Sequence, residues 1–265
     1  MDNEKTGNHR GSSSNVNVMG ITQIPEIHRG DRIGEIILTA ITTQGFSIQK
    51  GDIMVVTQKI VSKSEGRLVH LDTIKPSADA FQLAAQSGKD PRLIELVIQE
   101  SKSIVRIDSE RGIIISETRH GFICANAGID TSNIEGDDIV ALLPEDPDYS
   151  ADLIHTQMKK AGLRFRVPVI ISDTFGRPWR EGQTNVAIGI SGIAPLKDYR
   201  GDKDMFGNVL SVTNIAIADE LASAAELVMG KTDRIPVAIV RGYFHISRES
   251  TANELIRDCD MDLFR

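Results

Sequence analysis

The chain has 265 residues, of which 40% are hydrophobic and 25% are charged, and its net charge is -7. This length can bury a full hydrophobic core in one large or two small domains. The acidic balance argues against a general nucleic-acid-binding protein, which would carry a basic face. The two cysteines, Cys124 and Cys259, are too few for a disulfide framework, and we expect two reduced, mostly buried thiols.

Neither a membrane span nor a targeting segment is indicated. No apolar run approaches the ~20 residues that cross a bilayer, and the N-terminus lacks the apolar core of a signal peptide. We therefore expect a cytoplasmic protein without a membrane partner. Residues 1–17 are rich in Asn, Ser, Gly and charge, which predicts a disordered tail before an ordered domain over 18–265.

The first half of that domain alternates apolar and polar segments of helical and strand length. A polar, basic run over 58–67 follows one strand and has no predicted element of its own. In chain order we expect an apolar run over 18–24 that Pro25 ends, a helix over 32–43 capped by Asp31, a strand over 53–57, and helices over 77–87 and 90–102 that begin at Ser77 and Asp90.

The second half predicts more strands and two long loops. A helix followed directly by a strand suggests a crossover unit of a parallel sheet. The fold class is therefore mixed α/β. The sequence alone does not give the order of the strands. The expected elements are strands over 113–115 and 122–124, a loop over 125–148, a helix over 151–161 capped by Ser150, strands over 167–171 and 186–190, a loop over 191–212, a helix from Thr213 or Asn214 to Met229, and a strand over 237–240.

Two aspartates have unusual local settings. Asp130 and Asp173 each follow a short apolar run, where a buried strand would end in a Gly-rich turn. Carboxylates held at strand ends are suited to gripping a hard divalent cation. Arg177 and Arg180 beside the second aspartate suit phosphate or carboxylate groups. This combination indicates metal-assisted phosphoryl chemistry.

Acidic residues on the last predicted helix allow two interpretations. Asp219 and Glu226 are seven residues apart and share a helix face, with Glu220 beside the first. They form either a solvated acidic face or the place where one acid completes a metal site with Asp130 and Asp173. Trp179, the only tryptophan, is expected to pack in the core.

The segment 225–232 fits a permissive phosphate-loop pattern in the wrong context. A phosphate loop follows a strand and opens a helix, whereas this segment closes one. We therefore predict a helix C-cap at Gly230, with Lys231 near the negative end of the helix dipole. The histidines form no close ligand pair and no nucleophile motif is present, so neither a zinc site nor covalent acyl chemistry is indicated.

Several long, nearly gapless blocks between about residues 21 and 242 resemble the coenzyme F-420 gamma-glutamyl ligase family. They cover 51–67, 120–133, 142–147, 172–183 and 219–231. The resemblance implies an unusual α/β fold of mixed sheets with flanking helices, in an intertwined homodimer. It also implies a GTP-dependent ligase that adds L-glutamate, once or more through gamma linkages, to the lactyl carboxylate of F-420-0 through an acyl phosphate.

The resemblance further implies two divalent cations, Mn²⁺ or Mg²⁺, helped by K⁺. Asp130 and Asp173 match positions at the first cation, and Thr174 and Glu226 match positions at the second. Residues that match the GTP site, together with lysines assigned to the phosphates by their charge, are Ile24, Pro25, Glu26, Ile27, Lys59, Ser62, Lys63, Asn133, Ala224, Ala225, Glu226, Leu227, Val228, Met229, Gly230 and Lys231.

Charge alone assigns catalytic roles to Arg177 and Arg180, which we expect to bind the carboxylates of glutamate or the phosphodiester of the acceptor. Three alternatives stay open at this point. They are another metal- and nucleotide-dependent carboxylate–amine ligase, a metal-dependent phosphohydrolase, and a nucleotide-binding module without turnover.

Overall fold

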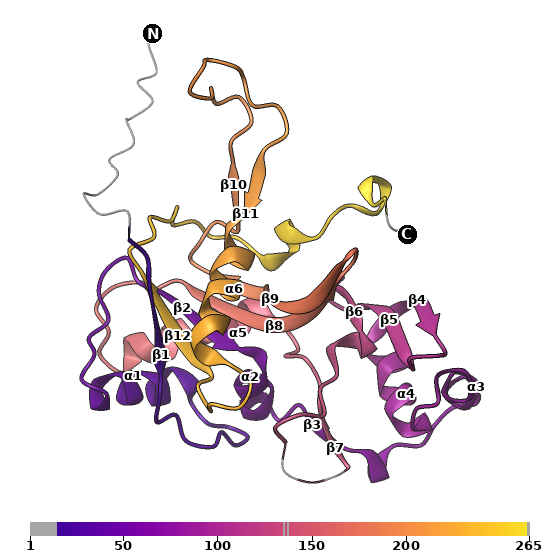
Figure 1. Ribbon diagram of the computed structural model, residues 1–265. Coiled ribbons are helices and arrows are strands. Elements are labelled where there is room, and N and C mark those ends of the chain that lie inside the picture. Colours follow the sequence, from indigo (N-terminus) through magenta and orange to yellow (C-terminus); the bar gives the residue numbers. More distant parts are fainter. Residues whose placement is uncertain (1–14, 135, 137, 264–265) are drawn as a thin grey trace.

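The computed structural model describes residues 15–134, 136 and 138–263. A five-stranded sheet forms its centre, a three-stranded sheet lies to one side, and a two-stranded arm projects from the body (Figure 1). The expected mixed α/β class is confirmed. No helix in these described residues is both long and apolar enough to cross a bilayer.

The central sheet has the strand order β1-β12-β2-β8-β9. Strands β2 and β8 pair in parallel, and every other neighbouring pair is antiparallel. Because the helix before β8 returns the chain to the side of β2, the expected crossover is present. The strands are β1 (Asn17–Ile21), β2 (Ile53–Thr57), β8 (Val169–Arg177), β9 (Arg180–Ser191) and β12 (Val237–Arg241).

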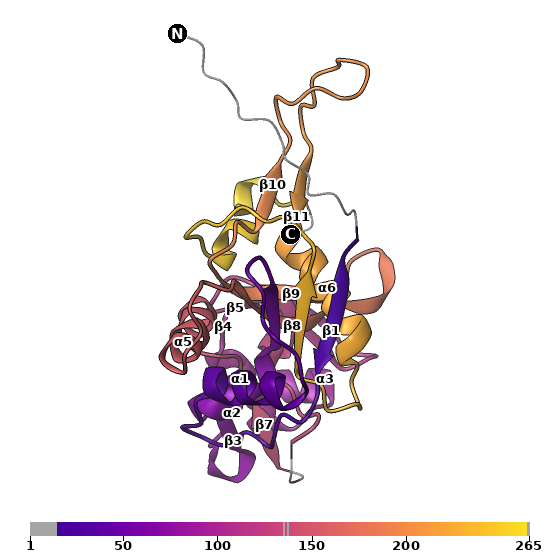
Figure 2. The ribbon, with the colours of Figure 1, turned by 90° about the vertical axis from the view of Figure 1, so that its left-hand side faces the viewer.

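Alternation along the central strands divides the core into two layers. Met54 and Val56 face one layer and Ile53 and Val55 face the other, as period-two alternation requires. Helices α1 (Ile33–Thr43) and α5 (Pro147–Lys160) cover the first face, and α6 (Ile217–Met229) covers the second (Figures 1 and 2).

A smaller unit, inserted in the chain between β2 and β8, has its own core. Ile94, Val97 and Ile114 lie at the centre of that core. Helix α2 (Gln58–Glu65) leads from β2 to the unit, and its Ile60 and Val61 pack in the core of the central sheet. The elements of the unit are β3 (Leu68–His70), α3 (Ala78–Ser87), α4 (Pro91–Gln99), β4 (Ser101–Asp108), β5 (Ile113–Thr118), β6 (Ile123–Ala125) and β7 (Ile139–Ala141), with 3-10 turns at Leu71–Thr73 and Asn126–Gly128.

The arm consists of β10 (Leu196–Asp198) and β11 (Asn214–Ala216) with the long loop between them (Figures 1 and 2). The loop expected over 191–212 is present for the most part, interrupted by the three residues of β10. After β12 the described chain, up to residue 263, has no further strand and passes through 3-10 turns at Ala252–Leu255 and Cys259–Met261.

Several expected boundaries are wrong for identifiable reasons. The helix expected over 90–102 ends at Gln99 because Ser101 begins β4. The helix expected after Ser150 starts at Pro147, where the Asp146 side chain accepts the Tyr149 N–H. The last long helix starts at Ile217, since the residues before it pair with β10.

Other differences concern caps, thiols and the tail. Asp31 accepts the His28 N–H at 2.8 Å and does not cap α1. Cys124 is buried, but Cys259 is exposed, so only one thiol is where we expected it. Of the expected disordered tail, 1–14 lies outside the described residues, and Asn17 already pairs with Arg241 in the central sheet.

Candidate functional site

Asp173 lies inside β8 and not at the end of a strand. The strand continues to Arg177 and turns into β9, forming a long hairpin. Because successive residues of a strand point to opposite faces, Asp173 faces the α1 side and Thr174 faces α6. The hairpin therefore presents candidate ligands on both of its faces.

On the Asp173 side, Asp130 is held by its backbone and by two partners. Its N–H and C=O exchange hydrogen bonds of 2.9 and 2.8 Å with Ala141. Its carboxylate accepts the Ser132 N–H at 2.7 Å and contacts Lys59 Nζ at 2.8 Å. Lys59 lies in the first turn of α2 and also reaches the Ser132 carbonyl and hydroxyl, both at 2.9 Å.

The two aspartates differ in ionisation. Burial opposes ionisation of Asp130, but the hydrogen bonds from Lys59 and Ser132 outweigh it and lower the pKa of this carboxyl. Burial, helped by the negative charge of Asp130, raises the pKa of Asp173 to about 7 against the opposing effects of the Thr174 N–H, Lys59 and Lys231. The two carboxyl groups thus lie close enough to interact. The nearby lysines supply too little positive charge to hold the pKa of both carboxyls low.

On the α6 side, four side chains form a connected group. Thr174 Oγ1 donates to Asn185 Oδ1 at 2.7 Å, and Asn185 Nδ2 donates to Glu226 Oε2 at 2.9 Å. Lys231 Nζ lies 3.0 Å from Glu226 Oε1 and donates to Thr174 Oγ1 at 2.5 Å. Asn133 Nδ2 donates to the Lys231 carbonyl at 3.3 Å and so connects this group to the segment that carries Asp130.

Residues expected at the nucleotide divide into accessible and buried sets. Lys63 pairs with Glu26 and approaches the Asn133 carbonyl at 3.4 Å, so these three segments meet. The Ser62 hydroxyl is buried and donates to Gln58 Oε1 at 2.8 Å. Three of the expected residues, Ile27, Ala225 and Met229, pack their side chains into the core, so these side chains cannot contact a nucleotide directly. Ile24 is partly buried against the core, and Ala224 and Val228 are half-buried. The exposed residues are Pro25, Leu227, Gly230 and Lys231.

The end of α6 has the form that the sequence context predicts. The Gly230 N–H donates to the Glu226 carbonyl at 3.0 Å, and Gly230 has a positive φ of 57°. The segment is a helix C-terminus, and the reading as a phosphate loop is excluded.

The acids on α6 have different surroundings. Asp219 Oδ1 accepts the Ala187 N–H of β9 at 2.9 Å, and it lies about 10 Å along the helix from Glu226. Glu220 is exposed. Glu226 is therefore the acid that meets the site, but beside Thr174 and not in one cluster with Asp130 and Asp173.

The hairpin arginines lie away from the acids. Arg177 and Arg180 are paired at the tip of the hairpin, and Arg177 donates to the Glu181 carbonyl at 2.9 Å. Four residues of strand place Arg177 about 13 Å from Asp173. Trp179 is 85% exposed in the turn between the arginines, so the expectation that it packs in the core is wrong.

The donors fit two divalent cations if other molecules complete the coordination. No three His, Cys, Asp or Glu side chains in the described part of the chain form a group that could hold a metal ion. Asp130 with Asp173, and Thr174 with Glu226, are hard oxygen donors. Mg²⁺ is commonly held by one or two carboxylates plus substrate phosphates and water, which matches each set.

Sequence reasoning missed Asn185. It is 3% exposed and bonds to both donors on the α6 side. The signal was a polar residue directly before the apolar run 186–190, at the entrance of a predicted strand. A buried amide there requires partners, which points to a polar site.

The chain is similar to proteins of one known family. The chain matches the model of the family described as F420-0:Gamma-glutamyl ligase over residues 21–242. It is 44% identical to the Coenzyme F420:L-glutamate ligase of Methanothermobacter thermautotrophicus over 94% of this chain and 99% of the relative. It is 43% identical to the protein of that name from Methanocaldococcus jannaschii (94% and 97%) and 40% identical to that from Methanosarcina mazei (93% and 94%).

Proposed function

The chain belongs to the F420-0:gamma-glutamyl ligase family and is a ligase, and from this premise we propose that it joins L-glutamate to the lactyl carboxylate of F-420-0 with GTP as the energy source. One or more glutamates are added, the later ones through gamma linkages. Mn²⁺ or Mg²⁺ at two positions and K⁺ as an activator complete the proposal, with the cytoplasm as its location.

One observation carries the proposal. Two sets of oxygen donors, each with a lysine ammonium, lie on the two faces of one hairpin. Such an arrangement of carboxylates and lysines suits a nucleoside triphosphate with its cations, because phosphates attract lysines while cations attract carboxylates. Asp130 and Asp173 would hold one cation, and Thr174 and Glu226 the other.

The chemistry requires an activated carboxylate, since oxide is a poor leaving group. A carboxylate oxygen of the acceptor attacks the terminal phosphorus of GTP, which releases GDP and gives an acyl phosphate. The glutamate amine then attacks the acyl carbon, loses a proton and expels inorganic phosphate. Divalent cations, when bound, offset the negative charge that builds up on the phosphoryl group during transfer.

The residues of this chain contribute position and charge. Lys59 and Lys63, both on α2, and Lys231 after α6 have their ammonium groups on the site and are placed to meet phosphate oxygens. Arg177 and Arg180, farther along the hairpin, suit the carboxylates of glutamate or the phosphodiester of the acceptor, which extends beyond the reacting carboxylate.

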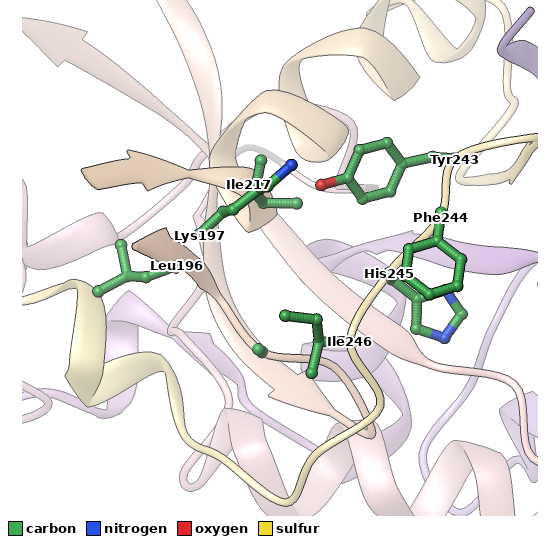
Figure 3. A pocket seen from close by; sticks show the side chains of 8 residues that line it. Leu196, Lys197, Ile217, Tyr243, Phe244, His245 and Ile246 are labelled. Carbon is green, nitrogen blue, oxygen red and sulfur yellow. The ribbon is translucent and has the colours of Figure 1, made fainter. Parts of the chain in front are cut away.

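The exposed apolar residues of the arm support a homodimer. Met205, Phe206, Val209 and Val212 near its tip are largely exposed in this chain, and apolar groups that gather in this way commonly mark an interface. A cavity of ≈ 110 Å³ lies at the base of the arm, lined by Leu196, Ile217, Tyr243 and Ile246 among others (Figure 3). A second copy of the chain is the occupant that we propose for these apolar surfaces.

The proposed reaction is tested by mass spectrometry of F-420-0 incubated with the purified chain, GTP, Mn²⁺ and L-glutamate. We expect products heavier by one or more glutamyl units, and none when GTP is omitted or replaced by ATP. Phosphate release without a mass gain and without a need for glutamate would instead identify a phosphohydrolase. GTP binding with neither outcome would identify a binding module.

A further inference from the structure

We propose that Asn185 is a positioning residue that fixes the donor atoms of the second cation site. It does so through Thr174 and Glu226, and it does not itself bind the cation. The inference rests on the proposed function only in supposing that a cation binds between those two residues.

The first group that Asn185 orients is the Thr174 hydroxyl. A hydroxyl has one proton and two lone pairs. Thr174 Oγ1 donates its proton to Asn185 Oδ1 at 2.7 Å, so its lone pairs remain as acceptors. They face Lys231 Nζ, which donates to the same oxygen at 2.5 Å. The amide oxygen of Asn185 thereby turns Thr174 into an acceptor directed at a positive charge.

The second group that Asn185 orients is the Glu226 carboxylate. Asn185 Nδ2 donates to Oε2 at 2.9 Å, which fixes the plane of the carboxylate. The other oxygen, Oε1, is left for Lys231 Nζ at 3.0 Å. One amide therefore holds one atom of each ligand and directs the remaining lone pairs of both toward the same point.

Asn185 is rigid enough for this role. It is 3% exposed, pairs with Thr174 in the β8–β9 register, and its own carbonyl accepts the Ser223 hydroxyl at 2.8 Å. The amide has only one orientation that satisfies both partners, because a rotated amide would place its oxygen against the Glu226 carboxylate. Residues that orient metal ligands in this way commonly change metal affinity by about 10–100-fold when they are replaced.

The Lys231 ammonium marks the point where the free lone pairs converge. It lies 3.5 Å from Asn185 Oδ1, farther than from either ligand atom. A divalent cation in place of the ammonium would be held by Thr174 and Glu226, with Asn185 behind them. Lys231 would then be available for the phosphates of the nucleotide.

The test replaces the amide by a side chain of similar size without polar atoms, Asn185→Leu. Mn²⁺ binding is measured by electron paramagnetic resonance with GDP present and with neither F-420-0 nor glutamate. We expect two sites in the unmodified chain. In Asn185→Leu we expect one of them to weaken by about 10–100-fold and the other to change less than about twofold.

Ser223→Ala is the matched control, since it removes a hydrogen bond to the Asn185 backbone but none to Thr174 or Glu226. We expect both Mn²⁺ sites to remain in it. Should Asn185→Leu not fold, as judged by its thermal unfolding, the smaller Asn185→Ala replaces it. In active protein the KM for Mn²⁺ should rise much more than kcat falls.

Unchanged Mn²⁺ binding in the Asn185 variants would overturn the inference, and so would equal weakening in Ser223→Ala. The unmodified chain could bind Mn²⁺ at two sites yet make no glutamyl product. If one of these sites were then lost in Asn185→Leu, the positioning role would be supported while the proposed reaction failed. A glutamyl product together with unaffected Mn²⁺ binding in the variant would do the reverse.

Discussion

Two of the three candidate ligand carboxylates have a lysine as counter-ion. Lys59 contacts Asp130, and Lys231 contacts Glu226. An ammonium is a single charge without a fixed coordination geometry, whereas a divalent cation brings two charges and draws phosphate oxygens with it. Under the proposed function, loading the site would therefore exchange lysine–carboxylate contacts for cation–carboxylate and lysine–phosphate contacts. Asp173, whose pKa is raised to about 7, gains most from the added positive charge.

Asp130→Asn keeps the size of the side chain and removes the charge. We expect ligation to fall by more than about 100-fold, because even residues behind metal ligands cost about 10–100-fold in affinity or activity. The free energy of unfolding should change by about 1 kcal/mol or less, since the Lys59 pair is partly solvated. Turnover assays and urea unfolding measure the two quantities, with exposed Asp72→Asn as the control. Wild-type turnover would remove Asp130 from the site.

The two thiols should differ sharply in reactivity. Burial, with the nearby charge of Asp173, raises the pKa of Cys124 to about 12, so this thiol stays protonated at pH 8, and the thiolate is the reactive form. Cys259 is exposed. A maleimide applied to the native protein at pH 8 should label Cys259 alone, as shown by peptide mass mapping, and Cys124 only after denaturation. Fast labelling of Cys124 in the native state would contradict its placement.

Asp130 and Asp173 were identifiable from the sequence as candidate ligands, since acids beside apolar runs stand out, and Glu226 was one of three acids on the last helix until the family resemblance singled it out. Their arrangement was not identifiable. The sequence suggested one cluster, but strand alternation places Thr174 and Glu226 on the face opposite Asp173. Asn185 escaped notice because a single amide at a strand entrance has many structural explanations. Trp179 misled because its hydrophobicity favours burial, whereas it occupies a hairpin turn with a φ of 64°.

Among the elements, those with clean boundaries were predicted best. Strand β2 follows a Gly51-Asp52 turn and has the expected bounds, and α3 begins after Ser77 as expected. Helix α2 was missed because its inward residues include Gln58, Ser62 and Lys63, which a hydrophobic pattern cannot identify as buried. Those polar residues belong to the candidate site, which is where local pattern and structure commonly disagree. Strand β4 was missed because its residues are mostly exposed or half-buried.

Helix α5 holds the central sheet and the C-terminal segment together through one side chain. Asp148 Oδ1 accepts the Ile190 N–H at 2.7 Å and the Ala252 N–H at 3.0 Å. Asp148→Ala leaves two buried N–H groups without an acceptor, at about 1–3 kcal/mol each. Urea unfolding should show this loss, and Asp79→Ala on the exposed face of α3 should not. Equal stability of the two variants would show that water satisfies those N–H groups.

At the scale of the whole molecule, the arm projects from the body and leaves apolar side chains exposed near its tip. Its long loop could be predicted as a loop, but not as a projection, because the pairing of β10 with β11 involves only three residues on each strand. The homodimer that we propose covers its apolar tip. It also accounts for exposed Phe244 beside the cavity at the base of the arm.

Phe206→Ser combined with Met205→Ser should weaken the dimer, because two exposed apolar side chains lose their contact area. Sedimentation equilibrium should show a dimer for the unmodified chain and a shift toward monomer for the double variant. Leu227→Ser, on α6 and 86% exposed, controls for the loss of an exposed apolar group elsewhere. A monomeric unmodified chain would contradict the proposal, as would an unaffected dimer in the double variant.

The proposed reaction depends on activation of the acceptor carboxylate by phosphoryl transfer. The most direct measurement uses F-420-0 whose lactyl carboxylate is labelled with ¹⁸O, together with GTP, Mn²⁺ and L-glutamate. The acyl-phosphate route moves one labelled oxygen into each inorganic phosphate released, and mass spectrometry of the phosphate detects it. Unlabelled phosphate, released while glutamyl product forms, would contradict the account.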